Sequence, residues 1–272
     1  MAALPTLFVS HGAPTFALDP GSTGAAIASL AARLPRPKAI LAVSAHWETA
    51  APAVSAATNP ETIHDFYGFP EPLYRLRYPA AGAPWLAERV ATLLGQAKLP
   101  VVVDAGQGLD HGAWVPLLHM WPKADIPIVQ LSIQTPLGAA HHFAVGQALA
   151  PLADEGVLIL GSGGVTHNLR EFRMSRENES VAPYVTEFRD WLADRLAAGD
   201  TEAVVDYRNR APHAARAHPS EDHFLPLFVA YGAAAGGQRH ERVHSAVTYG
   251  VIGMDAYVFA AERLDSEMPA AA

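Results

Sequence analysis

The chain has 272 residues, half of them hydrophobic and 17% charged, which is enough to bury the core of one large α/β domain or two small ones. Its formal net charge of -8 argues against a protein that grips nucleic acid electrostatically, because such a protein needs a basic face. The sequence contains no cysteine, so it excludes a disulfide framework and a thiolate metal site. Any metal ligands must therefore be His, Asp or Glu.

Apolar strand-like runs alternate with helical stretches, a pattern typical of a mostly parallel or mixed twisted sheet flanked by helices on both faces. In the first half of the chain we predict a strand from residue 6 into a turn at 11, a helix over 24–34, strands over 39–44 and 53–57, a helix over 84–97, a strand over 101–104 and a helix over 111–120. In the second half we predict a strand over 127–133, a helix over 136–153, a strand over 157–161, helices over 183–198 and 222–235, and strands over 243–248 and 255–259. No repeat, linker or domain boundary is visible, so we expect a single α/β domain over 1–272, with a frayed tail from about residue 266.

The segment 59–79 is rich in Pro, Gly, Tyr and Phe, and we predict a long ordered loop there. Loops of this length inside a domain are often functional lids. Within it, His64 either touches a ligand or only ties the loop down. Arg75 and Arg77 follow, and a solvated surface position is the simpler expectation for both than contact with a substrate carboxylate.

Three predicted strands run into polar turns that each carry a histidine, namely His11, His46 and His167. In an open α/β sheet, ligands bind beyond the carboxyl ends of the strands, so we expect these imidazoles at one edge of the sheet. Such a group indicates a metal centre or an acid–base site. A hydrogen-bonded structural role suits any one of them taken alone, but their equivalent positions favour a shared site.

Two further histidines have a context that favours function. His111 follows Asp110, which can cap a helix that begins there, and His223 lies in the first turn of the predicted helix 222–235, behind a Ser220 cap. A loop histidine and a surface helix histidine are the simpler alternatives for the two positions. We predict structural or solvated roles for the histidines that lack comparable context: His119, His141, His142, His213, His240 and His244.

Other catalytic motifs are weak or missing. The run Gly161-Ser-Gly-Gly follows a strand but lacks the spacing of a P-loop or of a dinucleotide-binding fingerprint. The sequence has no G-x-S-x-G nucleophile elbow, so Ser162 is a poor candidate for a nucleophile. The N-terminus has no basic region followed by an apolar stretch, and no apolar run reaches the ~18 residues of a membrane span, so we expect a cytoplasmic protein with no membrane contact.

Seven motifs occur in order with compatible spacing: Ser-His-Gly-Ala-Pro at 10–14, Val-Ser-Ala-His-Trp at 43–47, Ile-His-Asp-Phe-Tyr-Gly-Phe-Pro at 63–70, Leu-Asp-His-Gly-Ala-Trp at 109–114, Gln-Leu-Ser-Ile at 130–133, Val-Thr-His-Asn-Leu at 165–169 and Glu-Asp-His-Phe-Leu-Pro-Leu at 221–227. Together they resemble the DOPA-dioxygenase branch of the class III extradiol ring-cleaving dioxygenases, the LigB-like superfamily. The resemblance covers nearly the whole chain, from about residue 5 to residue 260.

The resemblance implies one mononuclear non-haem metal, with His11, His46 and His223 at the ligand positions. His167 matches a histidine at the metal that is either a further ligand or the acid–base group beside it. His111 matches a second acid–base or oxygen-stabilising histidine. Family members work with Fe(II), yet purified ones can carry Zn(II), and imidazole suits both metals.

The ligand set departs from the usual non-haem iron triad of two histidines and one carboxylate. Here the third position is His223, with Glu221 and Asp222 adjacent to it. Three neutral ligands leave the site one unit more positive, which favours a dianionic catecholate but also favours zinc. Two consecutive glycines, Gly163 and Gly164, precede His167, so this turn contains more glycine than the resemblance leads us to expect.

As a function, the resemblance implies cleavage of the ring of a DOPA-like catechol with O2, giving a muconic semialdehyde-type product. His111 and His167 are the expected acid–base residues, and His64 and Tyr67 are the expected substrate contacts from the loop. The expected partners are a catechol and O2, without nucleic acid, and a homo-oligomer is compatible with the sequence. Two alternatives stay open: a zinc hydrolase that uses the same histidines and water, and a non-enzymatic superfamily member.

Overall fold

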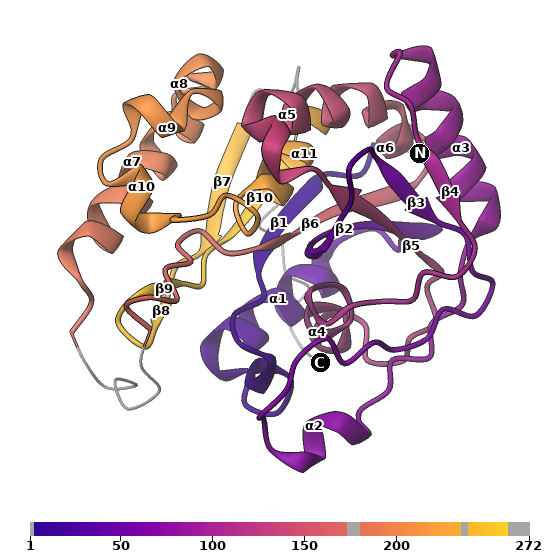
Figure 1. Ribbon diagram of the computed structural model, residues 1–272, viewed down its shortest axis with the longest axis horizontal. Coiled ribbons are helices and arrows are strands. Elements are labelled where there is room, and N and C mark those ends of the chain that lie inside the picture. Colours follow the sequence, from indigo (N-terminus) through magenta and orange to yellow (C-terminus); the bar gives the residue numbers. More distant parts are fainter. Residues whose placement is uncertain (1–2, 173–179, 235–238, 261–272) are drawn as a thin grey trace, which may run out of the picture.

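The computed structural model describes residues 3–172, 180–234 and 239–260, so the tail predicted from residue 266 lies outside the described residues. Eight strands form one sheet: β1 (Thr6–Ser10), β2 (Ala39–Glu48), β3 (Ala53–Ser55), β4 (Val102–Asp104), β5 (Ile128–Ile133), β6 (Val157–Gly163), β7 (Arg239–His244) and β10 (Ala256–Ala260). Their order across the sheet is β4-β3-β5-β2-β6-β1-β10-β7 (Figure 1). Two short strands, β8 (Val247–Thr248) and β9 (Ile252–Gly253), pair with each other as a separate hairpin.

The centre of the sheet is parallel and its margins are antiparallel. Strands β5, β2, β6 and β1 run parallel to one another, whereas β10 and β7 are antiparallel at one margin and β3 is antiparallel to β5 at the other. Every residue of β1, β5 and β6 is buried, as expected for parallel strands that are covered on both faces. The four central strands therefore end at one edge of the sheet, which is where the ligand crevice of such a fold forms.

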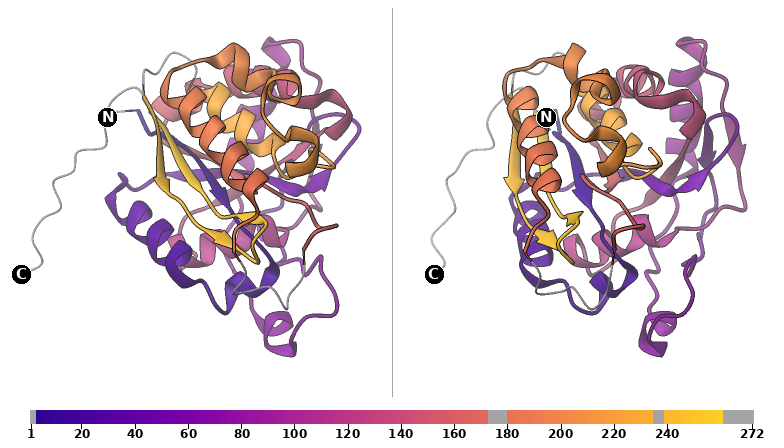
Figure 2. Two further views of the ribbon diagram at one scale, coloured as in Figure 1. Left: turned by 90° about the vertical axis from the view of Figure 1, so that its left-hand side faces the viewer. Right: turned by 60° about the vertical axis from the view of Figure 1, so that its left-hand side comes forward.

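Helices cover both faces of this sheet. They are α1 (Gly21–Arg33), α2 (Glu71–Arg75), α3 (Pro84–Gln96), α4 (His111–Met120), α5 (Gly138–Leu149), α6 (Pro151–Asp154), α7 (Pro183–Ala197), α8 (Thr201–Val205), α9 (Tyr207–Arg210), α10 (Ala214–Ala217) and α11 (Leu225–Ala233), with 3-10 turns η1 (Pro14–Ala17) and η2 (Thr135–Leu137). Helices α1 and α4 lie on one face, and α5 and α11 lie on the other (Figure 2). The predicted α/β fold with a mixed sheet between helices is confirmed. No helix in the described part of the chain is long and apolar enough to cross a bilayer.

Several predicted boundaries were wrong. The helix predicted over 136–153 is three pieces, because Gly138 adopts a positive φ of 66° and Pro151 has no N–H to continue α5. The loop over 59–79 contains the short helix α2. The helices α8 to α10 were missed because each is only four or five residues long and has no periodicity to detect. The strand predicted over 243–248 is interrupted between β7 and β8.

Two boundary errors bear on the site. Strand β2 continues to Glu48 instead of ending at Ser44, so His46 lies inside the strand. A register irregularity between Val43 and Glu48 in the pairing of β2 with β5 allows this extension. The last predicted helix begins at Leu225 rather than at residue 222, so His223 lies in the turn before α11 and not in its first turn.

Candidate metal centre

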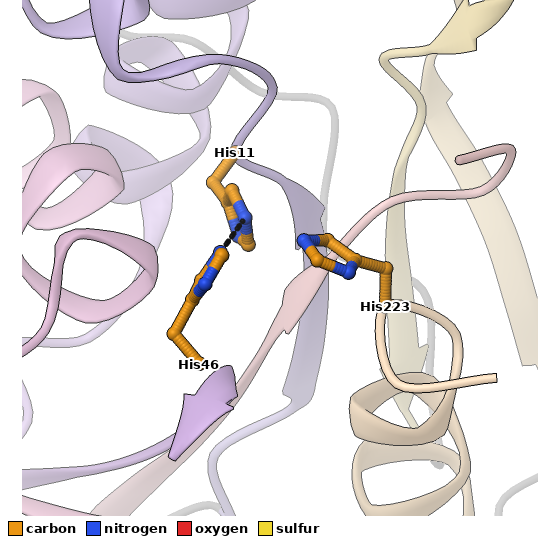
Figure 3. Close-up of side chains that lie close together, drawn as sticks. All are labelled: His11, His46 and His223. Atoms are coloured by element: carbon orange, nitrogen blue, oxygen red, sulfur yellow. Dashed lines mark hydrogen bonds between the residues drawn. The ribbon is translucent and has the colours of Figure 1, made fainter. Parts of the chain in front are cut away.

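Three histidines converge at the carboxyl edge of the parallel strands. His11 follows β1 directly, His46 lies near the end of β2, and His223 approaches from the turn before α11 (Figure 3). One ring nitrogen of each lies within 4.8 Å of the others. The Nε2 atoms of His11 and His46 are 3.0 Å apart. The edge predicted from the strand pattern is therefore where the imidazoles gather.

Hydrogen-bond partners at Nδ1 orient the rings of His11 and His223, and a carboxylate lies near Nδ1 of His46. The Ser162 hydroxyl donates to the carbonyl of Gly112, so it accepts from Nδ1–H of His11 at 3.0 Å. Nδ1 of His223 hydrogen-bonds to the carboxylate of Asp222. Nδ1 of His46 lies 3.5 Å from Asp65 Oδ2. With a proton on Nδ1, each Nε2 presents a lone pair, and such outer partners are the usual means of orienting a histidine ligand.

This donor set fits a divalent metal. Two Nε2 lone pairs that face each other at 3.0 Å repel, and a shared cation satisfies both. His223 supplies the third imidazole in the same group. Three neutral imidazoles suit Fe(II) and Zn(II) and leave further positions for water or substrate. The site therefore has the donors for the mononuclear metal that the sequence predicts.

Burial keeps these imidazoles in their neutral, ligand-competent form. Desolvation, followed by repulsion from the neighbouring histidines, lowers the pKa of His11 and His223 well below 6.5. Desolvation, with a smaller contribution from His111, lowers the pKa of His46 to about 3. Desolvation likewise lowers the pKa of His167 to about 4. At neutral pH each ring therefore has one nitrogen without a proton, and a metal can bind this nitrogen without displacing a proton.

These pKa shifts predict that acid destabilises the metal-free protein. Well above pH 6.5 the histidines are neutral in both the folded and the unfolded chain, so they do not alter the free energy of unfolding with pH. As the pH falls below 6.5, the unfolded chain binds protons that the folded site excludes. The free energy of unfolding should then fall by up to about 1.4 kcal/mol per pH unit for each such histidine. Urea unfolding between pH 7 and about pH 5 measures it. In this range Asp110, whose pKa burial raises to about 6, acts in the opposite direction, but as one group against four histidines. A flat profile would contradict these shifts.

His167 and His111 flank the three candidate ligands. The His167 ring stacks on that of His223, with centroids 3.4 Å apart and planes 10° apart. Its ring nitrogen groups with His223 and Asp222, rather than with His11 and His46. His111 is the first residue of α4, and its ring centroid is 3.9 Å from that of His46. The five histidines expected as metal ligands or acid–base groups thus lie together.

A cavity of about 310 Å³ opens onto four of these rings, all except that of His11. Its lining is largely apolar and aromatic and consists of Gly12, Ala13, Pro14, His46, Phe66, Phe69, His111, His167, Leu169, Phe172, His223, Tyr249 and Ile252. Phe66 and Phe69 come from the long loop, as expected of a segment that covers a site. Tyr249 and Ile252 come from the β8–β9 region. A flat aromatic substrate fits such a wall, with the histidines at its base.

The two predicted substrate contacts do not line this cavity. Tyr67 is 92% exposed, because the chain turns outward at Gly68, which has a positive φ of 77°, and only Phe66 and Phe69 face inward. Nε2 of His64 lies 3.1 Å from the carbonyl of Leu76. His64 therefore ties the loop down, the second of the two roles expected for it.

The arginines after the loop are engaged elsewhere. Arg75 pairs with Glu71 at 2.6 Å on the surface. Arg77 donates to the carbonyls of Tyr74 and Leu76 at 2.7 and 2.8 Å. Neither lines the cavity, so the solvated alternative describes them better than contact with a substrate carboxylate.

Asp110 caps α4 as the sequence predicts. Its carboxylate accepts from the N–H of Ala113 at 3.1 Å and from the hydroxyl of Ser44 at 2.6 Å, and Gln130 donates to it as well. Burial raises the pKa of Asp110 to about 6, against the opposing effect of its hydrogen bonds. Because Ser44 also accepts from the N–H of His46 at 3.2 Å, this buried network ties α4 to β2 at the site.

Sequence reasoning missed Asp65 and assigned no role to the hydroxyl of Ser162. Asp65 hydrogen-bonds to His111, and Ser162 orients His11. Asp65 lies within the motif at 63–70, and this motif is the sequence signal that could have identified it.

Most of the histidines predicted to be structural bond to groups away from the cavity: His119 to Phe16, His141 to Gln134, His142 to Gly138, His213 to Glu187 and His244 to Thr23.

The close approach of the His223 backbone explains why the first residue of the glycine pair before His167, Gly163, is a glycine. A Cβ on Gly163 would lie 2.0 Å from the carbonyl oxygen of His223, whereas a Cβ on Gly164 would meet nothing closer than 3.5 Å. We therefore predict that Gly163→Ala displaces the His223 backbone and weakens metal binding, and that Gly164→Ala, as the matched control, does not. Metal affinity by chelator competition tests this pair of variants. Equal affinities for the two would contradict the steric explanation.

Comparison with known proteins decides the family. Residues 5–260 match the family model described as the catalytic LigB subunit of aromatic ring-opening dioxygenase. The chain belongs to the LigB family. It is 44% identical over 258 residues to a 4,5-DOPA dioxygenase extradiol from Beta vulgaris, which covers 93% of this chain and 96% of that protein. It is 42% identical over 234 residues to a protein of the same name from Escherichia coli K12, with 85% of each chain covered.

A solved structure agrees with this assignment. The crystal structure of an uncharacterized protein from Escherichia coli K12 matches with a TM-score of 0.76 and 33% identity, covering 94% of this chain and 100% of that one. The prediction of an extradiol ring-cleaving dioxygenase, an oxidoreductase, is confirmed at the level of the LigB family. The family match favours this enzyme class over the zinc hydrolase and the non-enzymatic protein.

Proposed function

We propose that this LigB family member opens the ring of a DOPA-like catechol at one divalent metal held by His11, His46 and His223. The observation that carries the proposal is the convergence of three imidazole nitrogens within 4.8 Å of one another, with His46 and His223 lining an aromatic cavity. The names of the Beta vulgaris and Escherichia coli relatives support the substrate class. Cleavage beside the diol then yields a muconic semialdehyde-type acid.

We propose Fe(II) as the active metal and Zn(II) as a non-redox occupant of the same donors. Bound iron supplies the electron path through which O2 reacts with a catechol, which zinc does not offer. The chain contributes neutral imidazoles, of which His11 and His223 have their Nδ1 atoms held by Ser162 and Asp222. Three neutral ligands favour a doubly deprotonated catechol, because no carboxylate offsets the metal charge.

His111 and His167 are the proposed acid–base residues. Both line the cavity beside the candidate ligands, so both lie within reach of the hydroxyls of a bound catechol. One ring takes a proton from the substrate as it binds, and a protonated ring returns a proton as the oxygen–oxygen bond breaks. For His167 we favour this role over direct ligation, because it stacks on His223 and groups with Asp222. Phe66 and Phe69, which line the cavity, exclude water from the aromatic ring of the substrate.

The proposal is tested by loading the protein with Fe(II) under anaerobic conditions and measuring O2 uptake with DOPA, protocatechuate and 4-methylcatechol. We expect O2 uptake with a yellow product and the highest kcat/KM for DOPA. If O2 uptake were fastest with another catechol, the proposed reaction would stand and DOPA would be replaced as the proposed substrate. No uptake with any catechol despite stoichiometric iron would overturn the function.

Two further predictions concern the whole protein. We propose a cytoplasmic location, which cell fractionation tests. A homo-oligomer also stays a prediction, and light scattering of the purified protein measures its mass directly.

A further inference from the structure

A single loop carboxylate, that of Asp65, holds His111 at two points. Its Oδ1 accepts the backbone N–H of His111 at 2.8 Å, and its Oδ2 accepts Nδ1–H of the same residue at 2.8 Å. The same Oδ2 lies 3.5 Å from Nδ1 of His46. One side chain thus faces both a proposed acid–base histidine and a proposed metal ligand.

We propose that Asp65 is a positioning residue that holds the His111 ring in one orientation and one tautomer, with Nε2 toward the catechol. The inference rests on the proposed function of His111. A carboxylate that accepts from Nδ1–H leaves Nε2 without a proton and ready to receive one from the substrate.

Asp65 lies at the N-terminus of α4, where its carboxylate accepts a backbone N–H that has no partner within the helix. His111 is the first residue of α4, where free N–H groups and the helix dipole favour a negative charge. Asp110 already accepts from Ala113 at this terminus, so Asp65 serves a different N–H group, that of His111. The His111 side chain is 6% exposed and the Asp65 side chain 23%, so the hydrogen bond between them is partly shielded from water. Such shielding strengthens a charge-assisted hydrogen bond.

The loop around Asp65 is anchored on both sides. The N–H of Ile63 donates to the carbonyl of Leu109 at 2.8 Å, and the indole N–H of Trp114 donates to the carbonyl of Ile63 at 2.9 Å. On the other side, the Phe66 ring meets the His111 ring edge-on at 5.6 Å and 89°. The loop that covers the cavity therefore also determines where the His111 ring lies, through Asp65 between these anchors.

The test compares Asp65→Asn with Glu61→Gln in the iron-loaded enzyme. Glu61 is exposed on the same loop, so its substitution removes the same charge without touching His111. We expect Asp65→Asn to keep stoichiometric iron, to lower kcat about 10–100-fold and to leave KM for DOPA nearly unchanged. Glu61→Gln should match the parent enzyme. Loss of iron from Asp65→Asn would assign the residue to His46 instead and overturn the role at His111.

A double variant separates positioning from general stability. If Asp65 acts through His111, then adding Asp65→Asn to His111→Ala should change kcat by less than about twofold. If Asp65→Asn lowered kcat in the His111→Ala background by the same factor as in the parent enzyme, the proposal would be overturned. An Asp65→Asn single variant with the kcat of the parent enzyme would overturn it as well.

A second measurement does not depend on turnover. In 15N NMR of the metal-free protein, with the signals of His111 assigned by their loss in His111→Ala, we expect Nδ1–H in the parent protein. Asp65→Asn should abolish this single tautomer, because the amide can donate to Nδ1 as well as accept from it. Retention of Nδ1–H would overturn the inference. An inert parent enzyme would instead count against the proposed function and would leave the NMR result as an independent measure of Asp65.

Discussion

His46→Ala is expected to empty the metal centre and abolish ring opening. His46 supplies an Nε2 that lies 3.0 Å from Nε2 of His11, so its removal leaves two of the three convergent imidazoles. A ligand's hydrogen-bond partner is worth about 10–100-fold in metal affinity, and loss of the ligand itself should exceed that. His11→Ala is expected to behave in the same way. Metal content after dialysis, together with O2 uptake, measures both effects.

The matched control for these variants is His119→Ala. His119 lies on α4, and its ring bonds to the carbonyl of Phe16, away from the cavity. This variant should retain iron and turnover. Stoichiometric iron in His11→Ala or His46→Ala would remove that residue from the ligand set, and circular dichroism would exclude unfolding as the cause of any loss.

His111→Ala should lower kcat by about 10²–10⁴-fold while the iron remains bound, the usual range for loss of an acid–base group. The reason is its position, since the ring lines the cavity but lies outside the group formed by His11, His46 and His223. His167→Phe should lower kcat on the same scale. Its phenyl ring can keep the stacking on His223 while removing both ring nitrogens.

Iron content separates the two roles considered for His167. Retained iron with slow turnover supports the acid–base role, whereas parallel loss of iron and turnover would make His167 a ligand. Parental turnover in either variant would show that the residue carries no essential proton transfer. Single-turnover kinetics with excess enzyme ensures that chemistry, rather than product release, is compared.

The sequence predicts the edge of the sheet that carries the site because of a general property of parallel strands. β1, β2 and β6 lie side by side, so histidines at or beyond their carboxyl ends must come close together. The place of His223 could not be derived this way, because it lies in a turn before α11 and not after a strand. Its capped-helix context marked it only as a candidate, and the resemblance of its motif to the LigB-like superfamily placed it with the other ligands.

The loop contacts were beyond sequence reasoning for a different physical reason. The side of a loop that a residue faces depends on contacts distant in sequence, such as the hydrogen bond between Trp114 and Ile63. The chain bends at Gly68, which has a positive φ of 77°, and Tyr67 is exposed while Phe66 and Phe69 line the cavity. The role of Gly163 likewise emerges only when the His223 backbone is brought against β6.

The most direct test of the central claim is ring opening of DOPA under ¹⁸O2 by the iron-loaded enzyme, followed by mass spectrometry of the product. A dioxygenase at this centre consumes one O2 per ring and places both labelled atoms in the ring-opened product, apart from exchange of the aldehyde oxygen with water, which immediate reduction of the product limits. Consumption of DOPA with no label in the product, or with label in only one position after such trapping, would contradict the account.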